Sequence, residues 1–401
     1  MKPAPLAPSD LHGQRSRRTR LRVAGRVFIV DGEVLQLADA ESRIEALGQW
    51  SGIEPGQLVI VRGRWTGRAL VESRVEWQQA APTPRGDGEF ARLVLQGAGP
   101  RLRARARGLA VIRRYFEEQG FLEVETPLRV PAPYADANIE AVRAPPDWLI
   151  TSPELQMKRL VVGGIARQFQ LARVSRREER GALHEPEFTL LEWYRAFAGF
   201  EHVLRDTEVL VSRVARALRG RAELVAPGGL RIDARPPFER VSVAAAFRKH
   251  AGVRDVSDLA STDEDRYFEL LVSRVEPALA AHKAPVFLYE YPVQQASLSR
   301  PCAHDPRFAE RFELYAGGVE LCNGYGELTD PGEQRRRFAL ERGRRRRQGR
   351  APYPLDQRFL AALMEGMPPT GGNALGVDRL LMLALGAERV QDVLAFPRDA
   401  L

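Results

Sequence analysis

The residues best suited to chemistry lie between Phe169 and Tyr194. Arg176 and Glu178 are two apart on a segment predicted to be extended, and a polar loop separates them from a second strand-like run. Residues two apart on a strand point to the same face, so a hairpin would direct these side chains into one cleft. The second run adds Glu187, Phe188, Glu192 and Tyr194. A guanidinium, carboxylates and an aromatic ring together are suited to holding a nucleotide while a carboxylate attacks its α-phosphate.

The segment Thr151–Leu160 begins like a helix. Ser152 is a favoured N-cap residue, and Pro153 is favoured at the first helical position. Glu154 would then lie in the first turn, where the helix dipole favours a carboxylate. Capping alone explains Ser152 and Pro153.

The segment Arg311–Thr329 is rich in glycine and carboxylates. Glu313, Glu320 and Glu327 are seven apart, which on a helix would place them on one face, but the intervening glycines argue against a helix. We therefore predict two strands around a Gly-Gly turn. The carboxylates could hold Mg²⁺ on nucleotide phosphates, which needs only one or two protein carboxylates, or meet a substrate ammonium.

The segment Gly371–Leu385 combines a glycine-rich turn with an apolar run. Glycine lets the backbone approach a nucleotide closely, and the run after Arg379 predicts a buried helix.

Two domains are predicted to position these segments. Residues 1–20 are predicted to be a disordered basic tail, and residues 80–97 a linker. Between them, residues 21–79 contain short, glycine-punctuated strands that favour a small β-barrel of the OB type, with a β-module that binds no nucleic acid as the alternative. The strands are expected at Leu21–Val30, Val34–Ala38, Leu58–Trp65 and Ala69–Trp77.

Residues 98–401 form the larger predicted domain. It begins with an Arg-rich helix, because Leu109, Ile112, Tyr115 and Phe116 recur at helical spacing and Gly120 ends the pattern. An alternating strand, Phe121–Pro127, follows.

The helix–strand unit, the Arg176 hairpin and the Gly371 segment resemble motifs 1, 2 and 3 of class II aminoacyl-tRNA synthetases, in that order. Four sequence segments resemble lysyl-tRNA synthetase catalytic domains and, more closely, the elongation factor P lysylating ligases. They are Ser152–Leu160, His184–Arg195, Val319–Asp330 and Ala374–Gly386. The resemblance implies an α+β fold, in which a class II catalytic domain (an antiparallel sheet flanked by helices) follows the OB-like barrel. It also implies ATP-dependent activation of β-lysine or lysine as an adenylate, and transfer to a lysine ε-amine of elongation factor P.

Residue roles follow from the same resemblance. Arg176 and Arg379 are expected to be catalytic, with Arg176 neutralising charge on the α-phosphate. ATP binding is expected from Arg176, Arg177, Glu178, Glu185, Phe188, Glu320, Leu321, Gly376 and Arg379. Substrate binding is expected from Ser152, Pro153, Glu154, Tyr194 and Glu327. Mg²⁺ is assigned to Glu320 and Glu327, and motif 1 implies a homodimer. Arg177 and Glu185 depart from the family, which has a polar residue and an asparagine at these places.

Composition limits the partners and the compartment. The net charge is +8, but only four of the 60 basic residues are lysines, so arginine richness reflects a general bias. No apolar run reaches the roughly 20 residues that span a bilayer, so no membrane role is expected. No signal peptide and no disulfide framework are evident, which favours the cytoplasm. The Arg-rich run Arg335–Arg350 is predicted to be a helix with a solvated basic face for an acidic partner.

Two other functions stay open. RNA contact through the OB-like domain is possible, and an enzyme that charges tRNA, like lysyl-tRNA synthetase, is the main alternative. A non-catalytic synthetase paralogue is the second.

Overall fold

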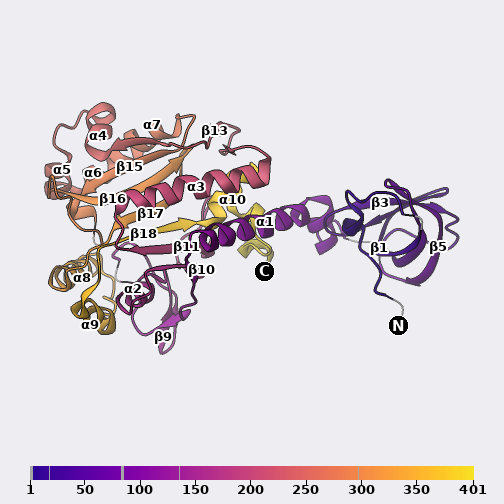
Figure 1. Cartoon of the computed structure of the whole chain (residues 1–401), viewed down its shortest axis with the longest axis horizontal. Coiled ribbons are helices and arrows are strands. Elements are labelled where there is room, and N and C mark those ends of the chain that lie inside the picture. The colour runs from indigo at the N-terminus through magenta and orange to yellow at the C-terminus, as the bar shows by residue number, and fades with distance from the viewer. Residues whose placement is uncertain (1–2, 18, 83–84, 135, 297) are drawn as a thin grey trace. The chain divides into compact units, whose positions relative to one another are not determined.

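The computed structural model describes residues 3–17, 19–82, 85–134, 136–296 and 298–401. The chain divides into two compact units, residues 1–106 and residues 107–401, and the boundary lies within helix α1 (Ala98–Glu118) (Figure 1). Among the described helices, none combines the length and apolar character that crossing a bilayer requires.

The first unit is built on a closed five-stranded barrel with strand order β1-β2-β3-β5-β4. Inward and outward residues alternate along its strands, as in β4, because successive side chains of a strand point to opposite faces. Four strands lie where the sequence predicts them, and the third was not predicted. The strands are β1 (Arg20–Asp31), β2 (Val34–Ala38), β3 (Arg43–Gly48), β4 (Leu58–Trp65) and β5 (Ala69–Gln79).

The segments flanking the barrel differ from the predicted tail and linker. A 3-10 helix, η1 (Pro8–Leu11), precedes the barrel, and Leu11 is only 1% exposed within the barrel's apolar core. The Leu6 amide donates to the Arg22 carbonyl at 2.8 Å. Apolar burial of Leu11 and backbone pairing at Leu6 therefore order part of a segment whose composition predicts disorder. The predicted linker contains a π-helical turn, η2 (Ala91–Leu95), while residues 1, 2, 18, 83 and 84 lie outside the described residues.

The second unit contains an eight-stranded sheet with helices packed against it, which confirms the predicted α+β class with a largely antiparallel sheet. Within this sheet, and among the described residues, only the β14–β15 and β10–β6 pairs are parallel. The sheet order is β14 (Glu239–Ser242), β15 (Val286–Pro292), β16 (Phe308–Ala316), β17 (Val319–Gly326), β18 (Thr370–Gly376), β11 (Glu187–Ala196), β10 (Arg167–Ser175) and β6 (Leu122–Glu123).

Helices α3 and α10 supply much of the core that packs against this sheet, including Leu210, Val211 and Leu381. The helices of the unit after α1 are α2 (Glu154–Val162), α3 (Phe200–Arg219), α4 (Val243–Ala251), α5 (Val256–Thr262), α6 (Glu264–Leu270), α7 (Glu276–Ala280), α8 (Pro331–Arg347), α9 (Gln357–Gly366) and α10 (Val377–Leu385). Short strands complete it: β7 (Arg129–Val130), β8 (Arg143–Ala144), β9 (Asp147–Leu149), β12 (Glu223–Val225) and β13 (Arg231–Asp233).

The predicted Gly-Gly hairpin is confirmed. Strands β16 and β17 are antiparallel and are joined by Gly317 and Gly318, whose φ angles are 57° and 81°. Both angles lie in the left-handed region that favours glycine, as a two-residue hairpin turn requires.

The glycine-rich turn predicted at Gly371 is instead the central strand β18. A Cβ on Gly372 would lie 2.3 Å from Glu327 Oε1 and 2.5 Å from Tyr194 Cε1. Glycine within a strand marks such a close approach, so the glycines here serve packing between neighbouring strands.

Candidate active site

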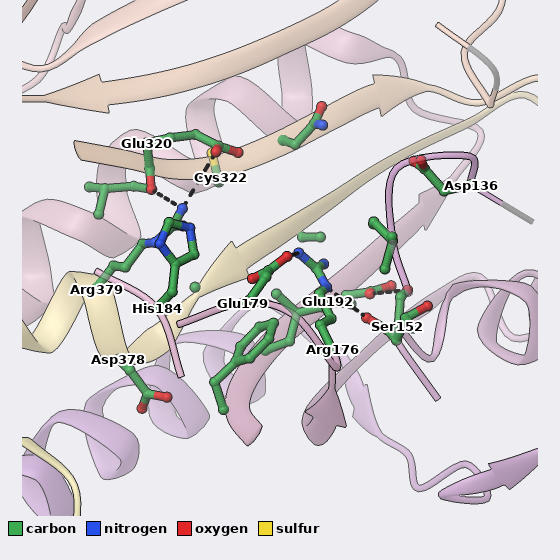
Figure 2. A pocket seen from close by; sticks show the side chains of 18 of the residues that line it. Asp136, Ser152, Arg176, Glu179, His184, Glu192, Glu320, Cys322, Asp378 and Arg379 are labelled. Carbon is green, nitrogen blue, oxygen red and sulfur yellow. Dashed lines mark hydrogen bonds and ion pairs between the residues drawn. The ribbon is translucent and has the colours of Figure 1, made fainter. Parts of the chain in front are cut away.

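A cavity of about 310 Å³ opens at the centre of the second unit, between β11, β17, β18 and the loops around them (Figure 2). Its size is within the range of small-molecule sites. Nine of the residues predicted from the sequence line it: Ser152, Glu154, Arg176, Glu185, Phe188, Glu320, Leu321, Gly376 and Arg379. The structure therefore brings together side chains from four separate parts of the chain.

Arg379, at the start of α10, organises one end of the cavity (Figure 2). Its Nη1 donates to the Glu320 carbonyl at 2.9 Å and lies 3.4 Å from Glu320 Oε2. Its Nη2 lies 2.6 Å from His184 Nε2, and arginine can only donate, so Nε2 accepts and the imidazole proton is on Nδ1. Burial, followed by the charge of Arg379, lowers the pKa of His184. His184 is therefore neutral, and its hydrogen bond holds the charged guanidinium of Arg379 in position.

Arg176 occupies the middle of the cavity. Its Cζ lies 5.0 Å from the centre of the Phe188 ring, and its Nη1 donates to Glu179 Oε1 at 3.0 Å. Strand β10 ends at Ser175, so Arg176 and Glu178 do not lie on one strand face. Glu178 instead points outward, where its Oε2 is 3.5 Å from Arg350 Nη2.

Arg177, like Glu178, is exposed and does not line the cavity. The structure therefore supports neither residue as an ATP contact, and Glu179 is the carboxylate that meets the arginine.

Glu185 lines the cavity, but both of its carboxylate oxygens have protein partners. Gln391 Nε2 donates to Oε1 at 2.7 Å, and the Arg398 amide donates to Oε2 at 3.1 Å. The glutamate that replaces the family's asparagine thus ties the C-terminal segment to the hairpin loop. These bonds argue for a structural role rather than the predicted ATP contact.

Carboxylates gather at the other end of the cavity. Ser152 Oγ donates to Glu192 Oε1 at 2.5 Å, and the Tyr194 hydroxyl donates to Oε2 at 3.0 Å. Burial, together with the charge of Glu154, raises the pKa of Glu192 to about 8 despite these two hydrogen bonds. Tyr194 itself does not line the cavity and acts through Glu192.

Lys158, on α2, lies behind this cavity wall. Its Nζ is 2.6 Å from Glu154 Oε1 and 2.5 Å from Glu327 Oε2, and its side chain is 1% exposed. Burial alone would lower the pKa of Lys158, but the two carboxylates raise it, so the lysine stays charged. Burial also raises the pKa of Glu327 to about 7, although Lys158 opposes this shift.

The Ser152 segment forms the predicted helix start with a shift of one residue. Helix α2 begins at Glu154, and Pro153 is its N-cap residue. Ser152 Oγ still accepts from the Glu154 amide at 3.0 Å, as a capping side chain does. Pro153 is buried and does not line the cavity, so its role is to begin the helix.

The predicted pairing of Glu320 and Glu327 around one Mg²⁺ does not fit the structure. Strand β17 runs between them, and seven residues of strand extend over roughly 20 Å. One magnesium ion with ligands near 2.1 Å cannot reach both carboxylates. Glu327 is the partner of Lys158, and only Glu320 of the two lines the cavity.

Several cavity residues were missed as site residues: Asp136, Glu179, His184, Arg311, Asn323 and Tyr325; Glu192 was singled out on the hairpin but given no role. Strand periodicity supports a cavity position for Glu192. Phe188, Leu190 and Glu192 alternate along β11, and all three line the cavity. Glu179 and His184 lie in a loop, where no periodicity applies.

The Arg-rich helix α8 is less solvated than predicted. Arg345 is 1% exposed, donates to Glu140 Oε2 at 2.8 Å and lies 3.9 Å from the Tyr353 ring. Its Nη1 also donates to the carbonyls of Asp136 and Ile139, each at 3.3 Å, and these two residues line the cavity. Part of the arginine run therefore supports the cavity wall.

Residues 87–400 match the family described as tRNA synthetases class II (D, K and N). The match covers well over half of the chain, so the chain belongs to this family. The chemistry of the family is ATP-dependent formation of aminoacyl adenylates, and its members in general use ATP and Mg²⁺.

Proposed function

Starting from membership of this class II family, we propose that the chain activates β-lysine, or lysine, with ATP and transfers the aminoacyl group to a lysine ε-amine of elongation factor P. The observation that carries the choice of a cationic substrate is the excess of buried carboxyl groups over basic groups at one end of the cavity. Glu154 and Glu192 line that end and Glu327 lies behind it, and among the described residues the one basic side chain paired with these carboxyl groups is Lys158. Buried carboxylates call for partners, and a substrate ammonium supplies one.

The polarity of the cavity also orients the substrate. The guanidinium groups of Arg176, in the middle of the cavity, and of Arg379, at its other end, suit phosphate oxygens. An amino acid would thus direct its amines toward Glu154 and Glu192 and its carboxylate toward Arg176. This arrangement favours attack of that carboxylate on the α-phosphate by positioning and charge neutralisation, without a protein nucleophile.

The residues present fit ATP and Mg²⁺. Carboxylate oxygens of Glu179 and Glu320 lie 3.0 Å and 3.4 Å from Arg176 and Arg379, so both guanidiniums can donate to anionic oxygens in this cavity. Phe188 would stack on the base, and Glu320 would hold Mg²⁺. When bound, Mg²⁺ would neutralise phosphate charge during the displacement.

Transfer then needs an unprotonated acceptor amine at the adenylate carbonyl. The amine nitrogen forms the new amide bond, AMP leaves with the electrons of the broken acyl–phosphate bond, and the amine proton passes to solvent. Elongation factor P as acceptor rests on the similarity of the four sequence segments Ser152–Leu160, His184–Arg195, Val319–Asp330 and Ala374–Gly386.

Charging of tRNA is the second candidate, and the first unit favours it. Residues 1–106 contain 17 Lys and Arg against 11 Asp and Glu, so they carry +6 of the net charge of +8. A basic barrel, which we continue to assign to the OB type, suits a polyanionic partner. A non-catalytic paralogue is the third reading, and the intact set of ATP-site residues argues against it.

We also propose, as motif 1 suggests, a cytoplasmic homodimer. Leu122 and Leu128 follow α1 and are exposed by 54% and 53%. A second copy would cover these apolar side chains, and sedimentation at two protein concentrations tests this.

The test is ATP–pyrophosphate exchange with β-lysine, lysine, aspartate and asparagine, followed by offering labelled adenylate to elongation factor P or bulk tRNA. We expect exchange with β-lysine or lysine and label on the protein acceptor. Label on tRNA alone would establish the second candidate, and no exchange with any amino acid would refute an activating enzyme.

Arg176→Ala tests whether the exchange activity depends on this cavity. It should reduce exchange by roughly 10²–10³-fold, as loss of a charge-stabilising donor does. Arg180→Ala, in an exposed position of the same loop, is the matched control and should leave exchange unchanged.

A further inference from the structure

Three side chains with different ligand atoms meet away from the cavity. Glu290 lies on β15, and Cys302 and His304 lie in the connection from β15 to β16. One ligand atom from each residue lies within 4.8 Å of the other two. Cys302 is 4% exposed, whereas the side chain of His304 is open to solvent.

The backbone at Glu290 is unusual for a strand residue. Its φ is 59°, in the left-handed region, and the β15–β16 register shifts between Tyr289 and Tyr291. A bulge of this kind redirects a side chain out of the regular alternation of a strand. Here it directs the Glu290 carboxylate toward Cys302 and His304, and His304 Nε2 is 3.4 Å from Glu290 Oε1.

The ligand types define the cation. A thiolate, an imidazole and a carboxylate are the three ligand classes that Zn²⁺ takes in proteins, at about 2.0–2.3 Å. Hard cations such as Mg²⁺ and Ca²⁺ prefer oxygen alone. We propose that Glu290, Cys302 and His304 bind a zinc-type divalent cation, with water in the fourth position. On binding, the Cys302 thiol forms the metal–sulfur bond and its proton passes to solvent.

The site would fix a segment that borders the candidate active site. In the same connection, the Arg300 amide donates to the Gly326 carbonyl at 2.8 Å, and Ser299 pairs with Glu327. Gln295, just after β15, lines the cavity. A cation bound here would link this connection to β15 and stabilise its position. The inference does not depend on the proposed function.

Titration of the whole chain with Co²⁺ tests the site, because a cobalt–thiolate bond gives a near-ultraviolet charge-transfer band. The chain contains two cysteines, Cys302 and Cys322, so the band can be assigned. We expect one equivalent of Co²⁺ to produce the band and one equivalent of Zn²⁺ to abolish it. Cys302→Ser should lose the band entirely, while Cys322→Ser, the matched control, should keep it.

His304→Ala should retain the thiolate but weaken Co²⁺ binding by roughly tenfold or more, since one of three protein ligands is gone. Circular dichroism of each variant would verify folding. No band in the wild-type chain, or a band that survives Cys302→Ser and disappears in Cys322→Ser, would overturn the proposal. Neither readout uses ATP or an amino acid, so this result is separate from that of the exchange assay.

Discussion

Replacing Glu192 with glutamine is expected to remove a pH dependence of the free energy of unfolding. Burial, together with Glu154, raises the pKa of Glu192 to about 8 from an ordinary value of 4.5. The folded chain therefore keeps this proton up to about pH 8, whereas the unfolded chain releases it near its ordinary pKa. Between these values the folded state binds more protons, so rising pH destabilises it by about 1.4 kcal/mol per pH unit.

From pH 5.5 to 7.5 this slope amounts to about 3 kcal/mol. The glutamine variant lacks the titration, so its stability relative to the wild-type chain should rise by that amount over the interval. Glu327, whose pKa is raised to about 7, titrates in both proteins and cancels from the difference.

The assay is urea unfolding at several pH values, followed by tryptophan fluorescence. Glu187→Gln is the matched control, because Glu187 lies on the same strand but its side chain is 63% exposed. Its difference from the wild-type chain should stay constant above pH 5.5. Parallel pH curves for the wild-type and Glu192→Gln proteins would refute the assignment of a buried, protonated carboxyl.

Other substitutions test the surroundings of the cavity. Lys158→Met leaves Glu327 buried without its cation and should destabilise the chain by about 3–5 kcal/mol, measured by urea unfolding; an unchanged midpoint would contradict the ion pair. Gly372→Ala introduces a Cβ 2.3 Å from a carboxylate oxygen and should cost about 1–3 kcal/mol, measured by the thermal midpoint. Arg345→Met should release the segment 136–140 and accelerate its amide exchange roughly 100-fold, since about 3 kcal/mol is lost with a buried charge pair; unchanged exchange there would refute the anchoring role.

The fold could be predicted where local pattern and tertiary packing agree. Alternation along Leu58–Trp65 places a strand at its observed bounds, and Gly317 and Gly318 supply the φ angles that a tight hairpin needs. The glycines of β18 were mistaken for a turn, because their role depends on Glu327 and Tyr194, which lie far away in the sequence. Leu11 shows the same limit, since its apolar contacts come from strands that composition alone does not place.

The candidate site shows a similar division. Arg176 was predicted because its type and neighbours are distinctive, but strand alternation was extended three residues too far, to Glu178. Strand β10 ends at Ser175, and in the loop beyond it Glu179 rather than Glu178 turns toward the guanidinium. The direction of a loop side chain depends on loop geometry, which has no periodic signature in a sequence.

The buried carboxylates are expected to make substrate affinity depend on pH. Without a ligand, Glu192 reduces its repulsion with Glu154 by holding a proton, in keeping with its raised pKa of about 8. A cationic substrate competes with a proton for the same oxygen atoms. Affinity for the proposed lysine-type substrate should therefore rise by up to tenfold per pH unit between pH 6 and 8 and then level off, because one proton must leave for each ammonium bound. Calorimetry in buffers of different ionisation enthalpy measures the released proton directly, and an affinity independent of pH over this interval would show that the substrate amine binds elsewhere.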